Sequence, residues 1–131
     1  MIKKLQNSPS GKFLNFKFMK EENGIFFFEI IFPPETASPL NLVQGGMIDA
    51  ALDEATSMTA YIAFKEEKLP LTTDHHVLFH RPMPLGKATM QTKIIKYGKT
   101  VTTIEGKLFD QNERLVATML HTALPTNIPN Q

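Results

Sequence analysis

Residues 43–55 read VQGGMIDAALDEA, a Gly-Gly pair followed by an almost wholly apolar run. No proline occurs from residue 41 to residue 69, and Ala, Leu and Met favour helices. The pattern predicts a long helix from Gly46 to about Phe64 that is apolar, and therefore buried, on most sides. Burying a charge is costly unless the charge is paired or used. Asp53, a carboxylate inside this run, is therefore the first candidate functional residue.

The predicted helix carries one narrow polar stripe. At 100° per residue, Asp49, Asp53, Thr56 and Ser57 fall on the same side, whereas Glu54 points away. Two interpretations remain open at this point. The stripe is either a solvent-exposed face or the wall of a site, where the neighbouring alanines would let a ligand or another backbone come close.

Strand patterns flank the helix, two before it and four after it. Alternating or β-branched runs predict strands at residues 13–19, 25–32, 72–80, 87–96, 100–109 and 115–124. One long helix with an antiparallel sheet curled around it is the natural α+β solution, and a second copy would cover what the helix leaves open. We therefore expect a single domain over residues 1–131, with an N-terminal tether at 1–11 and a C-terminal tail at 125–131.

Composition excludes several classes of function. The chain has 131 residues, a formal net charge of +1 and no cysteine. Near-neutral charge does not indicate a nucleic-acid partner, and the missing cysteines exclude disulfides and thiolate chemistry. The N-terminus lacks a signal-peptide pattern, and no apolar run approaches membrane length. We expect a cytoplasmic protein with no membrane partner.

The Gly-Gly pair has a structural and a functional interpretation. It can simply make room for a tight turn. Alternatively, the free amides of Gly45 and Gly46 at a helix N-terminus can stabilise a carbonyl oxygen that becomes an oxyanion, with Gln44 as an extra donor. Gly45 and Asp53 are separated by about 12 Å of helical rise, so they cannot both touch one carbonyl. If both are catalytic, one site takes the amide and the carboxylate from different chains.

The remaining polar candidates are weaker. Ser57, one turn after Asp53, could position a water, or its hydroxyl could bond back to the helix. In the strand at 72–80, alternation puts Thr73, His75, Val77 and Phe79 on one face, so His75 and His76 point to opposite sides. His76 and His80 share a face but lie about 13 Å apart, too far for one metal. We therefore expect no metal and no cofactor.

Several short motifs occur in a familiar order. They are Gln44-Gly45-Gly46 with Asp53, Thr72-x-Asp74, Phe79-x-Arg81-Pro82, Gly86, Tyr97-Gly98-Lys99 and Leu115-Val116-Ala117. In this order and spacing the chain resembles the PaaI-like branch of the hotdog-fold acyl-CoA thioesterases, over residues 38–124.

The resemblance implies a fold, a reaction and an assembly. It implies hydrolysis of a thioester, usually acyl-CoA, without a cofactor, by homodimers that often pair into tetramers and hold their sites between subunits. It implies that Asp53 acts as general base or nucleophile and that the Gly45 amide, with Gly46 beside it, polarises the carbonyl. Ser57 would help to position water.

Two departures from the family pattern bear on activity. Gln44 replaces the usual histidine, and Gln cannot carry a proton. Ser38 stands where many members have asparagine, unless the loop is shifted and Asn41 serves. The pocket and rim residues that the resemblance implies are Met47, Met58, Tyr61, and the partner's Val77 and Phe79 for the acyl chain, with Arg81, Lys96 and Lys99 for the CoA phosphates; ordinary surface charge is the alternative for the three cations.

Three other functions remain as alternatives. A hotdog protein that binds an acyl-CoA or acyl-carrier ligand without turnover is compatible with Gln44. A hotdog dehydratase would resemble an Asp followed by a His near the helix start, and no histidine lies in residues 37–64. A purely structural dimer would leave the polar stripe facing solvent. The acyl group cannot be read from the sequence.

Overall fold

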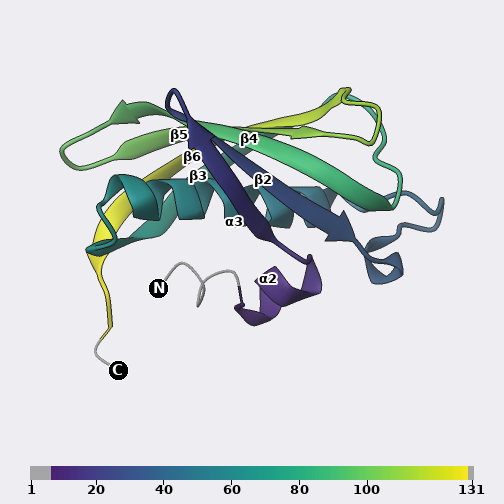
Figure 1. The fold of residues 1–131 in the computed structure, drawn as a ribbon, viewed down its shortest axis with the longest axis horizontal. Helices are drawn as coiled ribbons and strands as arrows, with labels where there is room; N and C mark the ends of the chain where they lie inside the picture. Colours follow the sequence, from purple (N-terminus) through teal and green to yellow (C-terminus); the bar gives the residue numbers. More distant parts are fainter. Residues whose placement is uncertain (1–6, 130–131) are drawn as a thin grey trace.

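The long helix lies along one face of a curved six-stranded sheet (Figure 1). The computed structural model describes residues 7–129. Its elements are α2 (Pro9–Phe13), β1 (Lys17–Glu22), β2 (Ile25–Phe32), a 3-10 turn (Pro34–Thr36), α3 (Gly45–Ala63), β3 (Lys68–Phe79), β4 (Gly86–Tyr97), β5 (Thr102–Phe109) and β6 (Leu115–Asn127). All strand pairs are antiparallel, so the predicted α+β architecture, a sheet wrapped around one helix, is confirmed.

The strand order is β1-β2-β4-β5-β6-β3, which puts β1 and β3 at the two edges of the sheet. Strand β3 pairs with β6 along its whole length, from Lys68 opposite Asn127 to Phe79 opposite Ala117. Its beginning contains Pro70, opposite Pro125. A proline lacks the N–H that a strand donates, and an edge strand tolerates this on its open side. The strand therefore starts before the predicted residue 72.

Helix α3 packs closely on the middle of the sheet. A Cβ added to Gly106 of β5 would lie 2.9 Å from Thr56 Cγ2 and 3.2 Å from Leu52 Cδ2, so only glycine allows this approach. The buried residues of the helix are Ile48, Ala51, Leu52, Ala55, Thr56, Met58, Thr59, Ala60 and Tyr61. The opposite side of the helix is covered in part by α2 (Figure 1), where the Ser10 hydroxyl donates to the Glu54 carboxylate.

The predicted strand at 13–19 was wrong in its first half. Ser8 caps α2 by accepting a hydrogen bond from the Gly11 amide at 3.2 Å, and Pro9 takes the first helical position that proline favours. This short helix replaces the end of the predicted tether at 1–11, whose residues 1–6 lie outside the described part. A tight hairpin turn joins β1 and β2, and its residues Asn23 and Gly24 both have positive φ, 53° and 79°, as an Asn-Gly pair favours.

Strand β3 contains a bulge that changes which side chains face the helix. Thr72 pairs with Ala123 and Asp74 with Thr122, so Thr73 is an extra residue. Its hydroxyl donates to the Thr122 carbonyl at 3.1 Å. The prediction that Thr73 shares a face with His75 was therefore wrong, because the bulge puts Thr72 there instead. At the other end, β6 continues to Asn127 and takes up the first part of the predicted tail at 125–131.

Candidate active site

The N-terminal end of α3 presents free backbone amides. Gln44 is the N-cap residue in an extended conformation, and its side chain makes no capping bond. Over residues 7–129, the amides of Gly45 and Gly46 have no hydrogen-bond acceptor. The Phe79 ring lies 3.5 Å from the position of a Cβ on Gly45. The amides at this end are therefore available to a ligand, and the helix dipole favours negative charge there.

A hollow of ≈ 320 Å³ opens beside these amides. Its walls come from the start of α3 and from the segment after β3: Val43, Gly45, Ile48, Phe79, His80, Arg81, Pro82 and Met83. Arg81 therefore lies where its prediction needs it, close to the amide end of the helix. Gln44 is exposed, and its side chain folds back over Gly46, with Oε1 2.9 Å from where a Cβ would be.

The middle of α3 presents carboxylates. The side chains of Asp49 and Asp53 are 40% and 45% exposed in this chain. The Ser57 hydroxyl donates to Asp53 Oδ1 at 3.2 Å, so the predicted contact between these two residues exists. Thr56 differs from the rest of the predicted stripe, because it is fully buried against the sheet and donates to the Leu52 carbonyl at 2.7 Å.

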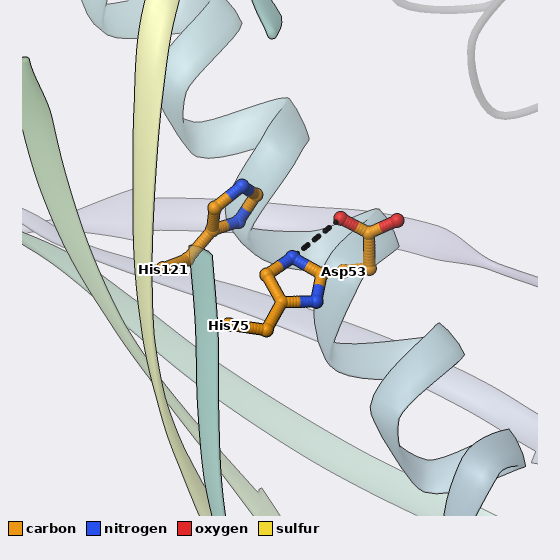
Figure 2. A group of neighbouring side chains, drawn as sticks. All are labelled: Asp53, His75 and His121. Carbon is orange, nitrogen blue, oxygen red and sulfur yellow. Dashed lines mark ion pairs between the residues drawn. The ribbon is translucent and has the colours of Figure 1, made fainter. Parts of the chain in front are cut away.

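His75 of β3 lies close to both carboxylates, and Figure 2 shows its ring beside Asp53. Its Nε2 is 3.1 Å from Asp53 Oδ1, and its Nδ1 is 3.2 Å from Asp49 Oδ1. These distances are those of ion pairs, yet the ring N–H directions miss the oxygens. By hydrogen-bond geometry, His75 Nε2 and Asp49 Oδ1 are buried atoms without a partner among residues 7–129. The imidazole is therefore close to both acids without being held by either through a well-formed hydrogen bond.

His121 of β6 completes this group. The register of β3 and β6 puts it directly opposite His75, with ring centroids 4.3 Å apart and an interplanar angle of 82°. It is fully buried, and its nitrogens meet Thr56 Oγ1 at 2.6 Å and Thr72 Oγ1 at 2.8 Å. Burial, followed by the charge of His75, lowers the pKa of His121 from 6.5 to about 4. The ring is therefore neutral at neutral pH.

Sequence reasoning missed this histidine pair. It compared only histidines near one another in the chain, whereas His75 and His121 meet through strand pairing. The signal was available, because Met119, His121 and Ala123 alternate along β6 and share its buried face. Asp53, His75 and His121 each offer one ligand atom, and these atoms lie within 4.8 Å of one another. They are the described residues that could hold a cation. His76 and His80 are exposed.

A second hollow, of ≈ 280 Å³, lies past Asp53 along the helix. Its lining residues are Ser8, Glu54, Ser57, Met58, Tyr61, Leu69 and Pro70. Met58 and Tyr61, both predicted to contact an acyl chain, are buried at 2% and 1% exposure and so form its floor. Desolvation by burial raises the pKa of the Glu54 carboxyl, against the opposing effect of its bond from Ser10.

The other predicted contact residues are dispersed. Met47 and Val77 are half-buried against the core, and Asn41 is exposed in the loop before α3 with φ 59°. Lys96 and Lys99 are exposed around the β4–β5 turn. That turn lies at the C-terminal end of α3, since the Tyr97 ring contacts Phe64 with a centroid distance of 5.9 Å. Within one chain, the two lysines are therefore at the opposite end of the helix from Arg81.

The chain belongs to the Thioesterase superfamily, whose family model matches residues 40–117. This confirms the resemblance and the expected class of enzyme, a thioester hydrolase, at the level of the family. Among curated proteins, one described as an esterase, from Saccharolobus solfataricus, is 28% identical over 106 residues, which cover 81% of this chain and 75% of the relative.

Solved structures share the whole fold. A thioesterase from Haemophilus influenzae superposes with a TM-score of 0.88 at 16% identity, covering 99% of this chain and 91% of its own. The Escherichia coli PaaI protein from the phenylacetic acid degradation operon has a TM-score of 0.83 at 14% identity, covering 99% and 91%. A Streptococcus mutans protein bound to acetyl-CoA has a TM-score of 0.77 at 16% identity, covering 90% and 94%. Within the described residues, no helix is long and apolar enough to span a membrane.

Proposed function

We propose that the protein hydrolyses acyl-CoA thioesters, with the reacting carbonyl between the amide end of one α3 and Asp53 of another. One observation carries the proposal: a single helix presents the Gly45 amide, which has no acceptor within the described part of the chain, at its first position and the carboxylate of Asp53 about two turns later. Family membership supports thioester chemistry, and the acetyl-CoA-bound neighbour supports CoA as the thiol part.

The chemical roles follow from what each group can do. The Gly45 amide, with Gly46 beside it, stabilises the negative charge that develops on the thioester oxygen. Asp53 removes a proton from water, or attacks the carbonyl carbon itself. Ser57, within hydrogen-bond distance of Asp53 Oδ1, orients that water. Gln44 adds an amide donor near the oxyanion but no proton, so the thiolate leaves without help from this position.

The edge strand β3 supports a site shared by two copies. Its side chains Leu71, Leu78 and Phe79 are 55%, 53% and 53% exposed. An unpaired edge with exposed apolar side chains is a ready surface for a second strand. In such a homodimer, which could pair further into a tetramer, the partner's Val77 and Phe79 would border the acyl chain. Within one chain, Arg81 is too far from Lys96 and Lys99 for them to bind the same CoA molecule together. In the dimer, the partner's Lys96 or Lys99 would contact the CoA phosphates together with Arg81 of the first chain.

The first experiment measures thiol release from short, medium, long and aryl acyl-CoAs, with wild type and Asp53→Asn side by side. The substitution keeps the size of the side chain and removes the base, so we expect a loss of at least about a hundredfold in kcat. Tight acyl-CoA binding without turnover in wild type would contradict hydrolysis and favour the receptor alternative that Gln44 allows.

Mixing two inactive variants tests the shared site. Gly45→Pro removes the amide and Asp53→Asn removes the base. If a site uses one group from each chain, every mixed dimer has one site with neither change, and the mixture recovers about a quarter of wild-type activity. If both groups act within one chain, mixing restores nothing. Co-refolding of the two variants and of each alone provides the comparison.

A further inference from the structure

We propose that Asp53, His75 and His121 form a binding site for a zinc-type divalent cation. The claim concerns binding, so it does not rest on the proposed hydrolysis. The three side chains converge from α3, β3 and β6, and their ligand atoms lie within 4.8 Å of one another (Figure 2). Two imidazoles and one carboxylate are a ligand set that zinc accepts, with a fourth position left for water.

The strand register builds the imidazole pair. His75 and His121 are directly opposite on neighbouring strands and face the same helix. Since side chains opposite each other in an antiparallel pair are neighbours, the backbone itself holds two ring nitrogens near one point. The bulge at Thr73 leaves His75 on this face together with Thr72. A backbone that fixes two ligands in advance reduces the entropy that a cation must overcome on binding.

The contact between His75 and Asp53 has the geometry of two ligands rather than of a hydrogen bond. Two atoms bound to one tetrahedral zinc at about 2.0–2.2 Å lie about 3.3 Å apart. His75 Nε2 and Asp53 Oδ1 are 3.1 Å apart. The nitrogen nevertheless has no hydrogen-bond partner in the described residues, because its N–H direction misses the oxygen. A cation between the two atoms would give this buried nitrogen a partner.

Outer partners are also present. A metal-bound histidine usually has a carboxylate or another acceptor at its second nitrogen, which fixes the ring. Asp49 Oδ1 lies 3.2 Å from His75 Nδ1 and would serve in this way once a bound cation turns the ring so that its N–H points at this oxygen. His121 has a threonine hydroxyl at each nitrogen, Thr56 on one side and Thr72 on the other. The cation replaces one of these hydroxyls, and the other continues to orient the ring.

Access and charge favour the cation. The side chain of Asp53 is 45% exposed, which leaves a path for the ion and room for a water. The carboxylates of Asp49 and Asp53 bring negative charge to the site, which offsets the two positive charges of the cation. A bound cation engages Asp53, so the base role proposed above belongs to the cation-free protein.

The test measures zinc binding by untagged, chelator-treated protein. Calorimetry gives the affinity and stoichiometry, and the visible spectrum of bound Co²⁺ reports the coordination number. Wild type is expected to bind about one Zn²⁺ per chain with a four-coordinate Co²⁺ spectrum. His75→Gln and Asp53→Asn each remove a ligand and should weaken binding by at least about a hundredfold. Asp49→Asn keeps an acceptor oxygen but removes the charge of the outer partner, and should cost about ten- to a hundredfold.

His76→Gln is the matched control, because it removes the neighbouring histidine from the opposite face of the same strand. The zinc affinity of this variant should stay within about twofold of wild type. Loss of an outer partner, by comparison, already costs about tenfold. Circular dichroism and thermal unfolding of each variant exclude misfolding. No stoichiometric binding by wild type would overturn the proposal, and so would equal losses in His75→Gln and His76→Gln. All readouts are made on resting protein, so they stand whether or not it hydrolyses thioesters.

Discussion

The start of α3 at Gly45 and its middle at Asp53 present different kinds of chemical group. At Gly45 the candidate groups are backbone amides beside an open hollow, and their position is set by where the helix begins. At Asp53 the candidate groups are side chains from three elements, and their position is set by strand register. An amide site survives changes of neighbouring side chains, such as Gln44 in place of histidine. A side-chain site is lost with one wrong residue or one shifted strand.

The largest expected effect is the loss of activity when only the backbone N–H of Gly45 is removed from the start of α3. Gly45→Pro removes the N–H at the first helical position, where proline is accepted, and Gln44 before it already has ψ 139°. We expect kcat to fall by about 10²–10³-fold, the usual loss for one oxyanion donor. Gly45→Ala keeps the amide and should stay close to wild type. Equal activity of both variants in thiol-release assays would show that this amide is not used.

A second pair of variants compares how closely each region is packed. Gly106→Ala puts a methyl group 2.9 Å from Thr56 Cγ2 beneath the middle of α3. We expect it to lower the free energy of unfolding by about 1–3 kcal/mol, as overpacking does. Gly45→Ala meets the Phe79 ring at an ordinary 3.5 Å and should cost little. Urea unfolding measures both, and a smaller cost at Gly106 than at Gly45 would reverse the comparison.

A smaller effect is a loss of folding stability at acid pH, and we expect it to arise only in the middle region, at His121. The pKa of His121 is about 4 in the folded protein and 6.5 as its ordinary value. The unfolded chain therefore binds more protons between these values, and stability present above pH 6.5 is lost as the pH falls toward 4. His121→Leu should flatten this part of the stability curve in denaturant titrations with chelator present. His80→Gln, an exposed histidine, should leave the curve as in wild type.

The smallest effect is expected at Ser57. Its hydroxyl donates to Asp53 Oδ1 at 3.2 Å in a partly exposed place, so Ser57→Ala should lose about 1 kcal/mol, or about fivefold in kcat. Ser10→Ala is the comparison, since Ser10 contacts Glu54 instead. Identical kcat in the two variants would mean that Ser57 does not position the water.

The fold could be predicted because its signals are local. Apolar periodicity gives α3, alternation gives the strands, and Asn23-Gly24 gives the first turn. The errors fell where local signals compete. Ser8 and Pro9 form a helix start that outweighs the alternation from residue 13, and the edge position of β3 lets a strand pass through Pro70.

The relative positions of the candidate residues could be predicted only within one helix. Helical spacing alone puts Gly45 at the start of α3 and brings Ser57 next to Asp53, and their chemical roles stay a prediction. The contribution of His75 and His121 depends on which strands are neighbours and on the extra residue at Thr73, and a pattern of period two cannot reveal a bulge. The separation of Arg81 from Lys96 and Lys99 depends on where turns that are distant in the sequence lie in space. These relations belong to the tertiary structure rather than to any one segment.

Pro70 has a consequence for solubility. An edge strand as long as β3 could recruit further chains in any register and start an aggregate. Pro70 offers no N–H to such a neighbour, so the first part of this edge is a poor template. Uncontrolled addition of further strands is then limited to residues 71–79. There, the second copy of the proposed homodimer can occupy the edge and exclude other chains. Replacing this proline should raise the tendency of concentrated protein to form fibrils, whatever its effect on catalysis.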